Sequence, residues 1–237
     1  MGNRIKFEEI VNFRDVGGYN TALGKQTLEG FIYRSSMLFG PTPADQQLMQ
    51  KLNLQTIIDL RAPAELEREP NPYKDEINHY YSINLSGQQD RGRAAELSTQ
   101  TTDPYFMSER YLEYVEGGRT EIGRLFRLLL QKEHYPLVIH CSAGKDRTGV
   151  VIYLILLLQG VLIEEIIADY QVSYTYIKHD SRILQNKQLL NVYHSYPEIM
   201  EQFHQKFHAA YGTIGNYLRE LSFTEDELLQ LKHLLVS

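Results

Sequence analysis

Along the chain, short continuous runs of apolar residues alternate with longer segments in which apolar residues recur at helical spacing. Short runs rich in β-branched residues predict strands at residues 31–34, 55–61, 80–85 and 136–139. Helical spacing predicts helices at residues 42–52, 105–130 with a break at 117–118, 150–158, 164–178, 183–193, 197–210, 212–221 and 224–235. Strands that alternate with helices predict an α/β fold, with a central, mostly parallel sheet flanked by helices and a helical C-terminal part.

The length of 237 residues predicts a single domain, residues 1–237, with room for an insertion. Residues 7–40 hold short strand-like pieces between glycines and predict a β-rich opening part. Residues 86–104 form a polar connection, and connections of this length in a compact domain are usually functional loops. Residues 178–210 predict a helical insertion whose polar face could cover a site as a lid.

The composition limits the classes of binding partner and the cellular compartments that we expect for this protein. The net charge of −6 argues against nucleic acid, because affinity for its backbone comes from clustered lysine and arginine. The apolar run at 150–158 is shorter than the ~20 residues that span a membrane, so no integral membrane segment is expected. The N-terminus shows no signal peptide, and a single cysteine fits a reducing compartment. We therefore expect a cytoplasmic protein, with secretion as the alternative.

The chemistry is concentrated in the loop His140–Gly149, between a predicted strand and a predicted helix. Backbone N–H groups at a helix start converge on an anion, and the same field favours the thiolate of Cys141. Arg147 can bind two oxygens of a phosphoryl group at once. We therefore predict that Cys141 attacks phosphorus. The predicted phosphate-binding residues are Ser142, Ala143, Gly144, Lys145 and Thr148, and the Thr148 hydroxyl is expected to donate to the sulfur.

The residue that protonates the leaving oxygen is open among three aspartates. Asp146 could act as the general acid, orient the arginine or cap the helix. Asp103 lies on the polar connection, and Asp59 ends a predicted strand. Arg61, which we expect to pair with Asp59, could add positive charge at the pocket.

Other charged residues suggest structural roles. Arg14 and Asp15 predict an ion pair that braces the loop. His204 and His208 have metal-like spacing, but the residues between them lack the glutamate of a zinc hydrolase motif. We therefore expect neither a metal site nor a cofactor.

The loop carries a resemblance to a known family. His140-Cys141, five residues and Arg147-Thr148-Gly149 resemble the signature of the cysteine-dependent protein tyrosine phosphatase superfamily. Gly-Lys-Asp before the arginine resembles its bacterial tyrosine and phosphoinositide phosphatase branch. Further matches to that branch lie at residues 12–18, 58–61 with Glu65, and 217–227.

This resemblance implies a protein tyrosine phosphatase-like fold and a phosphomonoesterase that forms a covalent phosphocysteine. Its substrates would be phosphotyrosine proteins, phosphoinositide lipids, or both. The Trp-Pro-Asp loop of many superfamily members cannot be present, because the chain has no tryptophan. The resemblance to this branch favours Asp146 as the acid, with Asp103 and Asp59 as alternatives. It also implies that Lys145 contacts phosphoinositide headgroups.

Two functions from other classes stay open. A rhodanese-like sulfurtransferase also places one cysteine in a loop of backbone amides, although Arg147-Thr148-Gly149 argues against it. A non-catalytic phosphate-binding module is the other alternative. Such modules usually lose the cysteine or the arginine, and this chain has both Cys141 and Arg147.

Overall fold

The computed structural model describes residues 3–85, 103–180, 190–234 and 236. In this part of the chain, five strands form one sheet in the order β1-β2-β5-β3-β4. All pairs are parallel except β1 with β2, which confirms the predicted, mostly parallel sheet. The strands are β1 Arg14–Asp15, β2 Ile32–Ser35, β3 Thr56–Asp59, β4 His79–Ser82 and β5 Leu137–His140.

The register of the sheet brings three strand ends together. His140 at the end of β5 pairs with Ser35 at the end of β2 on one side and with Asp59 at the end of β3 on the other. Ligands in α/β sheets bind outside the carboxyl ends of parallel strands. The loop that follows His140 therefore starts at the edge where such a site is expected.

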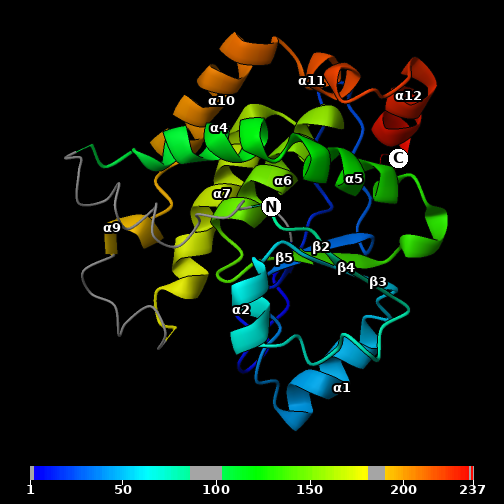
Figure 1. Cartoon of the computed structure of the whole chain (residues 1–237), viewed down its shortest axis with the longest axis vertical. Coiled ribbons are helices and arrows are strands. Elements are labelled where there is room, and N and C mark those ends of the chain that lie inside the picture. Colours follow the sequence, from blue (N-terminus) through cyan, green and yellow to red (C-terminus); the bar gives the residue numbers. More distant parts are fainter. Residues whose placement is uncertain (1–2, 86–102, 181–189, 235, 237) are drawn as a thin grey trace.

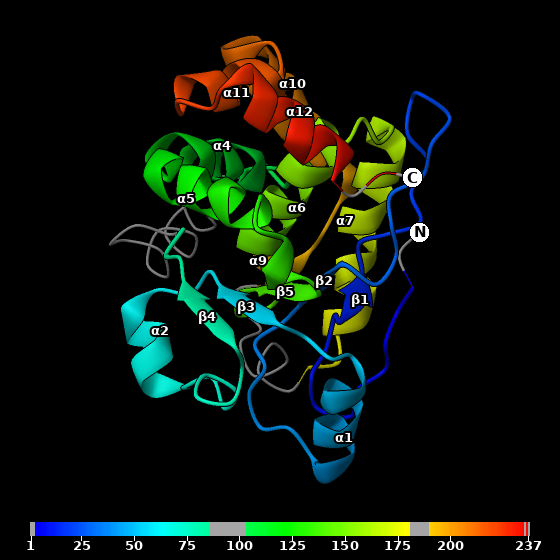
Figure 2. The same cartoon turned by 90° about the vertical axis from the view of Figure 1, so that its right-hand side faces the viewer.

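Helices cover both faces of the sheet (Figures 1 and 2). The helices α1 and α2 lie on one face, and α4 to α7 lie on the other, with α10, α11 and α12 stacked outside them. A short 3₁₀ helix, Lys132–His134, precedes β5. The α-helices are α1 Pro43–Lys51, α2 Pro63–Arg68, α4 Met107–Gly117, α5 Arg119–Leu129, α6 Asp146–Leu158, α7 Ile163–Ile177, α9 Leu190–Tyr193, α10 Pro197–Tyr211, α11 Ile214–Glu220 and α12 Glu225–His233.

The central helix is α6, and its sequence explains its place. Val150 to Leu156 are apolar almost without a break, and each of these side chains is buried. A helix that is apolar on all sides must be surrounded by protein or lipid. Here α6 contacts β2 and β5 below it and α4, α7 and α11 around it. No described helix is long and apolar enough to cross a membrane.

Most predicted helices are confirmed in type and approximate place. The chain between 105 and 130 forms α4 and α5 with a break at Gly118, and Thr42 and Thr224 begin α1 and α12 with capping boxes. Helix α2 is not predicted by the apolar pattern, because six residues show too little periodicity. It begins with Pro63 in the first turn, a placement that prolines favour.

The predicted lid lies only partly within the described residues. Residues 86–102 and 181–189 lie outside the described residues. The rest of the predicted insertion holds α9 and α10, and α10 packs on α4 and α7 through Ile199, Met200, Phe203 and Phe207. Because that face is buried in the main core, residues 197–210 are part of the fold and not a movable cover. A lid stays a prediction for the residues before α10.

Candidate active site

The candidate site is the loop from Cys141 to Lys145, which joins β5 to α6. Both flanking elements are buried, so the loop has a rigid support on each side. Cys141 is only 3% exposed. Gly144 has φ +68°, and a Cβ at this position would lie 2.2 Å from the carbonyl oxygen of Ser35. Only glycine therefore fits where the loop crosses the end of β2.

The loop carbonyls point toward the N-terminal part of the chain. Asn12 Nδ2 donates to the carbonyl oxygens of Ala143 and Gly144 at 3.0 Å each, and the carbonyl of Ser142 accepts from the Met37 amide at 3.0 Å. In a planar trans peptide the N–H points opposite to the C=O. The amides of residues 143–145 consequently turn the other way, into the loop.

A buried ion triad supports this orientation. Asp169 on α7 lies between Arg14, at 2.8 Å, and Arg34, which also donates to the carbonyl of Gly144 at 2.7 Å. Burial alone would raise the pKa of Asp169, but the two guanidinium groups hold it well below its usual range. The predicted pair of Arg14 with Asp15 is wrong, because Asp15 accepts backbone amides and Arg14 turns to Asp169.

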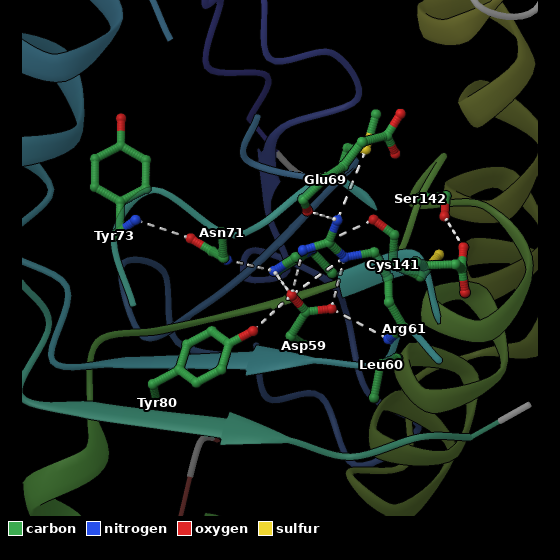
Figure 3. A network of polar contacts seen from close by, with 12 residues as sticks. Asp59, Leu60, Arg61, Glu69, Asn71, Tyr73, Tyr80, Cys141 and Ser142 are labelled. Atoms are coloured by element: carbon green, nitrogen blue, oxygen red, sulfur yellow. Dashed lines mark hydrogen bonds and ion pairs between the residues drawn. The ribbon is translucent and has the colours of Figure 1, made fainter. Parts of the chain in front are cut away.

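Behind the loop lies a second network, centred on Asp59 (Figure 3). The carboxylate of Asp59 accepts from Arg61 Nη2 at 2.7 Å and from Tyr80 at 2.9 Å, and it lies 3.2 Å from His140 Nε2. Asn71 also contacts His140 Nε2, at 3.1 Å. Although burial would raise the pKa of Asp59, His140 and Arg61 lower it well below its usual range.

These contacts correct two predicted roles. Asp59 is fully buried and held ionised, so it does not fit a general acid. Arg61 is 1% exposed, and its Nη1 donates to the carbonyl of Glu69 at 2.8 Å, so its guanidinium faces inward and not toward a substrate. The predicted ion pair of Asp59 with Arg61 is confirmed, and it supports the strand end next to His140.

Arg147 is fixed by a residue that the sequence analysis did not assign to the site. Glu65 on α2 accepts from Arg147 Nη1 at 2.6 Å and Nη2 at 3.2 Å, and it also accepts the hydroxyl of Ser142. Arg147 makes longer contacts to Ser142 Oγ, 3.2 Å, and to the carbonyl of Leu60, 3.4 Å. The guanidinium is therefore held beside the loop.

The position of Glu65 follows from the start of α2. Its carboxylate also accepts the backbone N–H of Ala62 at 3.0 Å, which caps the helix. Burial would raise the pKa of Glu65, but Arg147 and Ser142 lower it to about 2. Ala-Pro followed by a glutamate two positions later is a helix-start signal that could have predicted α2 and the capping role of Glu65 from the sequence, but not its contact with Arg147.

Lys145 and Asp146 end the loop side by side. Lys145 Nζ lies 2.6 Å from Asp146 Oδ1, and the Lys145 side chain is 0% exposed. The predicted substrate-facing lysine is therefore buried and paired. Asp146 is 21% exposed and also accepts the hydroxyl of Tyr111, from α4. The neighbouring Tyr170, from α7, hydrogen-bonds to Tyr111 at 2.8 Å.

Two other predicted residues lie differently from expectation. Thr148 Oγ1 is buried and has no hydrogen-bond partner among the described residues, so the expected bond to the Cys141 sulfur is not formed. Asp103 is exposed and accepts the amide of Tyr105 on the segment that leads into α4. Asp146, the first residue of α6, is thus the candidate acid that directly follows the loop.

A thiol and a guanidinium at the two ends of an amide-lined loop, between a parallel strand and a helix, are the parts of a cysteine-dependent phosphatase site. A profile of the tyrosine phosphatase family matches residues 5–237, so the chain belongs to the tyrosine phosphatase family. It is accordingly an enzyme, a hydrolase of the protein tyrosine phosphatase type.

Relatives with such names occur in bacteria. A protein of Cupriavidus necator, provisionally named a tyrosine-protein phosphatase, is 28% identical over 240 residues, which cover 91% of this chain and 83% of that protein. The triple specificity protein phosphatase PtpB of Mycobacterium tuberculosis is 28% identical over 185 residues, 67% of this chain and 65% of that protein.

Among solved structures, one match is the core catalytic domain of the PP-IP phosphatase SIW14 from S. cerevisiae in complex with citrate. The match has a TM-score of 0.39 and 18% identity, and it covers 91% of this chain and 98% of that chain. That score is too low to support a conclusion about this chain.

Proposed function

We propose that the chain hydrolyses phosphate monoesters through a covalent phosphocysteine, with phosphotyrosine as its preferred substrate. The observation that carries the proposal is the loop geometry: Cys141 starts it, Arg147 follows it, and the amides of residues 143–145 turn into it. Each of these groups suits a phosphoryl group with three equatorial oxygens.

In the first step the Cys141 thiolate attacks phosphorus, and the bond from phosphorus to the ester oxygen breaks. The loop amides and Arg147 stabilise the charge on the equatorial oxygens. The phosphoryl group would displace the two longer contacts of Arg147, to Ser142 and Leu60, while the pair with Glu65 keeps the guanidinium in place. Asp146 donates its proton to the leaving oxygen.

In the second step water attacks the phosphocysteine, and the sulfur leaves as a thiolate. Asp146, now a carboxylate, takes a proton from that water, so the enzyme returns to its starting state with phosphate as the product. The same aspartate therefore serves as acid and then as base.

The burial of two cations supports phosphotyrosine over phosphoinositides. The family resemblance links Lys145 to headgroups with additional phosphates, and Arg61 is predicted to add positive charge at the pocket. Both residues are buried and paired with aspartates. The relative PtpB is named a triple specificity protein phosphatase, so the test includes more than one class of substrate.

The test compares turnover of a phosphotyrosyl peptide, a phosphoseryl peptide and vesicles that carry phosphatidylinositol phosphates, with Cys141→Ser as the control. We expect the phosphotyrosyl peptide to be the best substrate and the Cys141→Ser variant to be inactive on all three. Faster turnover of the vesicles would refute the substrate preference. Persulfide formation from thiosulfate without phosphatase activity would instead support a sulfurtransferase.

A further inference from the structure

The carboxyl group of Asp146 is held from one side by two donors. Tyr111 Oη donates to Oδ1, and Lys145 Nζ lies 2.6 Å from the same oxygen. Neither donor is on the surface, because Tyr111 and Lys145 are both fully buried. Among the described residues, no side chain or amide contacts Oδ2 of Asp146 within hydrogen-bond distance. The two oxygens of this carboxyl group therefore have different environments.

The asymmetry decides where a proton can reside. A carboxyl oxygen accepts through two lone pairs, and Oδ1 already accepts two donors. An acid proton on Oδ1 would have to displace Tyr111 or the Lys145 ammonium. The proton of the neutral acid consequently belongs on Oδ2.

A second tyrosine fixes the direction of the Tyr111 hydroxyl. The hydroxyl has a single proton, which it donates to Asp146, so it must accept in its contact with Tyr170, 2.8 Å away. Tyr170 is fully buried, and its ring centroid lies 5.8 Å from Lys145 Nζ. Burial and the charge of Asp146 raise the pKa of Tyr111 well above its usual value, so this hydroxyl stays protonated and remains a donor.

We infer that Tyr111 and Tyr170 are positioning residues that act through Asp146: the chain Tyr170–Tyr111–Asp146 holds Oδ1 and directs the acidic proton, on Oδ2, to the leaving oxygen. This inference rests on the proposed function, in which Asp146 is the acid. It assigns a catalytic consequence to two tyrosines that lie on α4 and α7, outside the phosphate loop. Their rings also pack edge to face, with centroids 5.9 Å apart, which holds the hydroxyls together.

The test measures single-turnover phosphorylation of the enzyme by aryl phosphates whose phenols differ in pKa, from 4-nitrophenyl to phenyl phosphate. The parent enzyme should depend little on the leaving group, because the acid protonates it. Asp146→Asn should depend on it steeply. Tyr111→Phe should keep its rate with 4-nitrophenyl phosphate and lose about tenfold with phenyl phosphate, as expected for one hydrogen bond to a charged group.

Two further variants complete the design. Tyr170→Phe should change the leaving-group dependence in the same direction by about threefold, since it removes a hydrogen bond one step further away. Tyr217→Phe is the matched control, because its buried hydroxyl donates to the carbonyl of Val115 at 2.9 Å and makes no contact with Asp146. It should lower stability by a similar amount and leave the leaving-group dependence unchanged.

The outcomes distinguish the role of Asp146 as the acid from the positioning role of the two tyrosines. If Asp146→Asn shows no steeper dependence, Asp146 is not the acid, and the inference falls with it. If Asp146→Asn is steep while Tyr111→Phe follows the parent enzyme, the acid stands and only the inference is overturned. Should Tyr111→Phe fail to fold, Tyr170→Phe decides, and an unchanged dependence in that variant overturns the inference.

Discussion

Replacing Glu65 by glutamine removes the negative charge that Arg147 faces and leaves the size of the side chain unchanged. Glu65 is 3% exposed, and its two oxygens accept from Arg147 at 2.6 and 3.2 Å. The glutamine amide keeps one acceptor and points a donor at a guanidinium group, which has only donors. The variant therefore breaks a buried ion pair without opening a cavity.

The pKa of Glu65 sets the size of the stability loss that we expect in Glu65→Gln. It falls from 4.5 to about 2 in the folded protein, because the contacts with Arg147 and Ser142 outweigh burial. Since each tenfold change in proton affinity corresponds to about 1.4 kcal/mol, this shift corresponds to about 3 kcal/mol at most. Allowing for solvent at a pocket that admits substrate, we expect a loss of about 2 kcal/mol of unfolding free energy, or about 4–8 °C in Tm.

The sign of the pH dependence follows from the lowered pKa. The contribution of Glu65 is fully present above 4.5, the unfolded value, and is lost as the pH falls from 4.5 toward 2. A protonated glutamate resembles glutamine. The difference between parent and Glu65→Gln should thus be largest at neutral pH and shrink steadily in acid.

The assay combines urea unfolding across this pH range with kcat/KM on 4-nitrophenyl phosphate. We expect kcat/KM of Glu65→Gln to fall by about tenfold or more at neutral pH, because a displaced guanidinium no longer meets the equatorial oxygens. Glu225→Gln, at an exposed pair with Arg219, should match the parent in both measurements. If Glu65→Gln also matched the parent, Glu65 would not hold Arg147.

Three further predictions test the support of the loop. Gly144→Ala should abolish activity, since its Cβ would lie 2.2 Å from a carbonyl oxygen, whereas Gly24→Ala, with no atom within 4 Å, should lose only about 1 kcal/mol of stability and keep full activity. Asp169→Asn should lose about 3–5 kcal/mol in urea unfolding, because it leaves the guanidinium groups of Arg14 and Arg34 without a counter-charge. Hydrogen peroxide should inactivate the enzyme, and dithiothreitol should restore its activity if oxidation stops at the sulfenic acid of Cys141. A loss of activity that dithiothreitol never reverses would contradict this prediction. A Gly144→Ala variant as active as the parent, or an Asp169→Asn variant as stable as the parent, would contradict the other two.

The sequence was sufficient for the parts of the fold that depend on local pattern. Four apolar runs became β2 to β5, and the loop between β5 and α6 lies where the motif predicts it. The single cysteine and the arginine six positions later need only a strand, a tight turn and a helix to come together. Such short-range arrangements can be inferred from neighbouring residues alone.

Contacts between residues far apart in the sequence could not be predicted from the pattern of apolar and polar residues. Glu65 reaches Arg147 across 82 positions and Tyr111 reaches Asp146 across 35, and neither spacing leaves a local signal. Lys145 is predicted to face a substrate, but its ammonium group pairs with the next residue, Asp146, and the tertiary fold buries its side chain completely. The compartment of the protein remains a prediction from composition.

The central claim is that phosphorus is transferred to the sulfur of Cys141, and the most direct measurement is to trap that intermediate. Asp146→Asn protein, mixed with 4-nitrophenyl phosphate and quenched in acid, should carry one phosphoryl group on the Cys141 peptide in mass spectra, because the base that activates water is missing. Phosphate found on any other residue, or parent-like turnover by Cys141→Ser, would contradict the account.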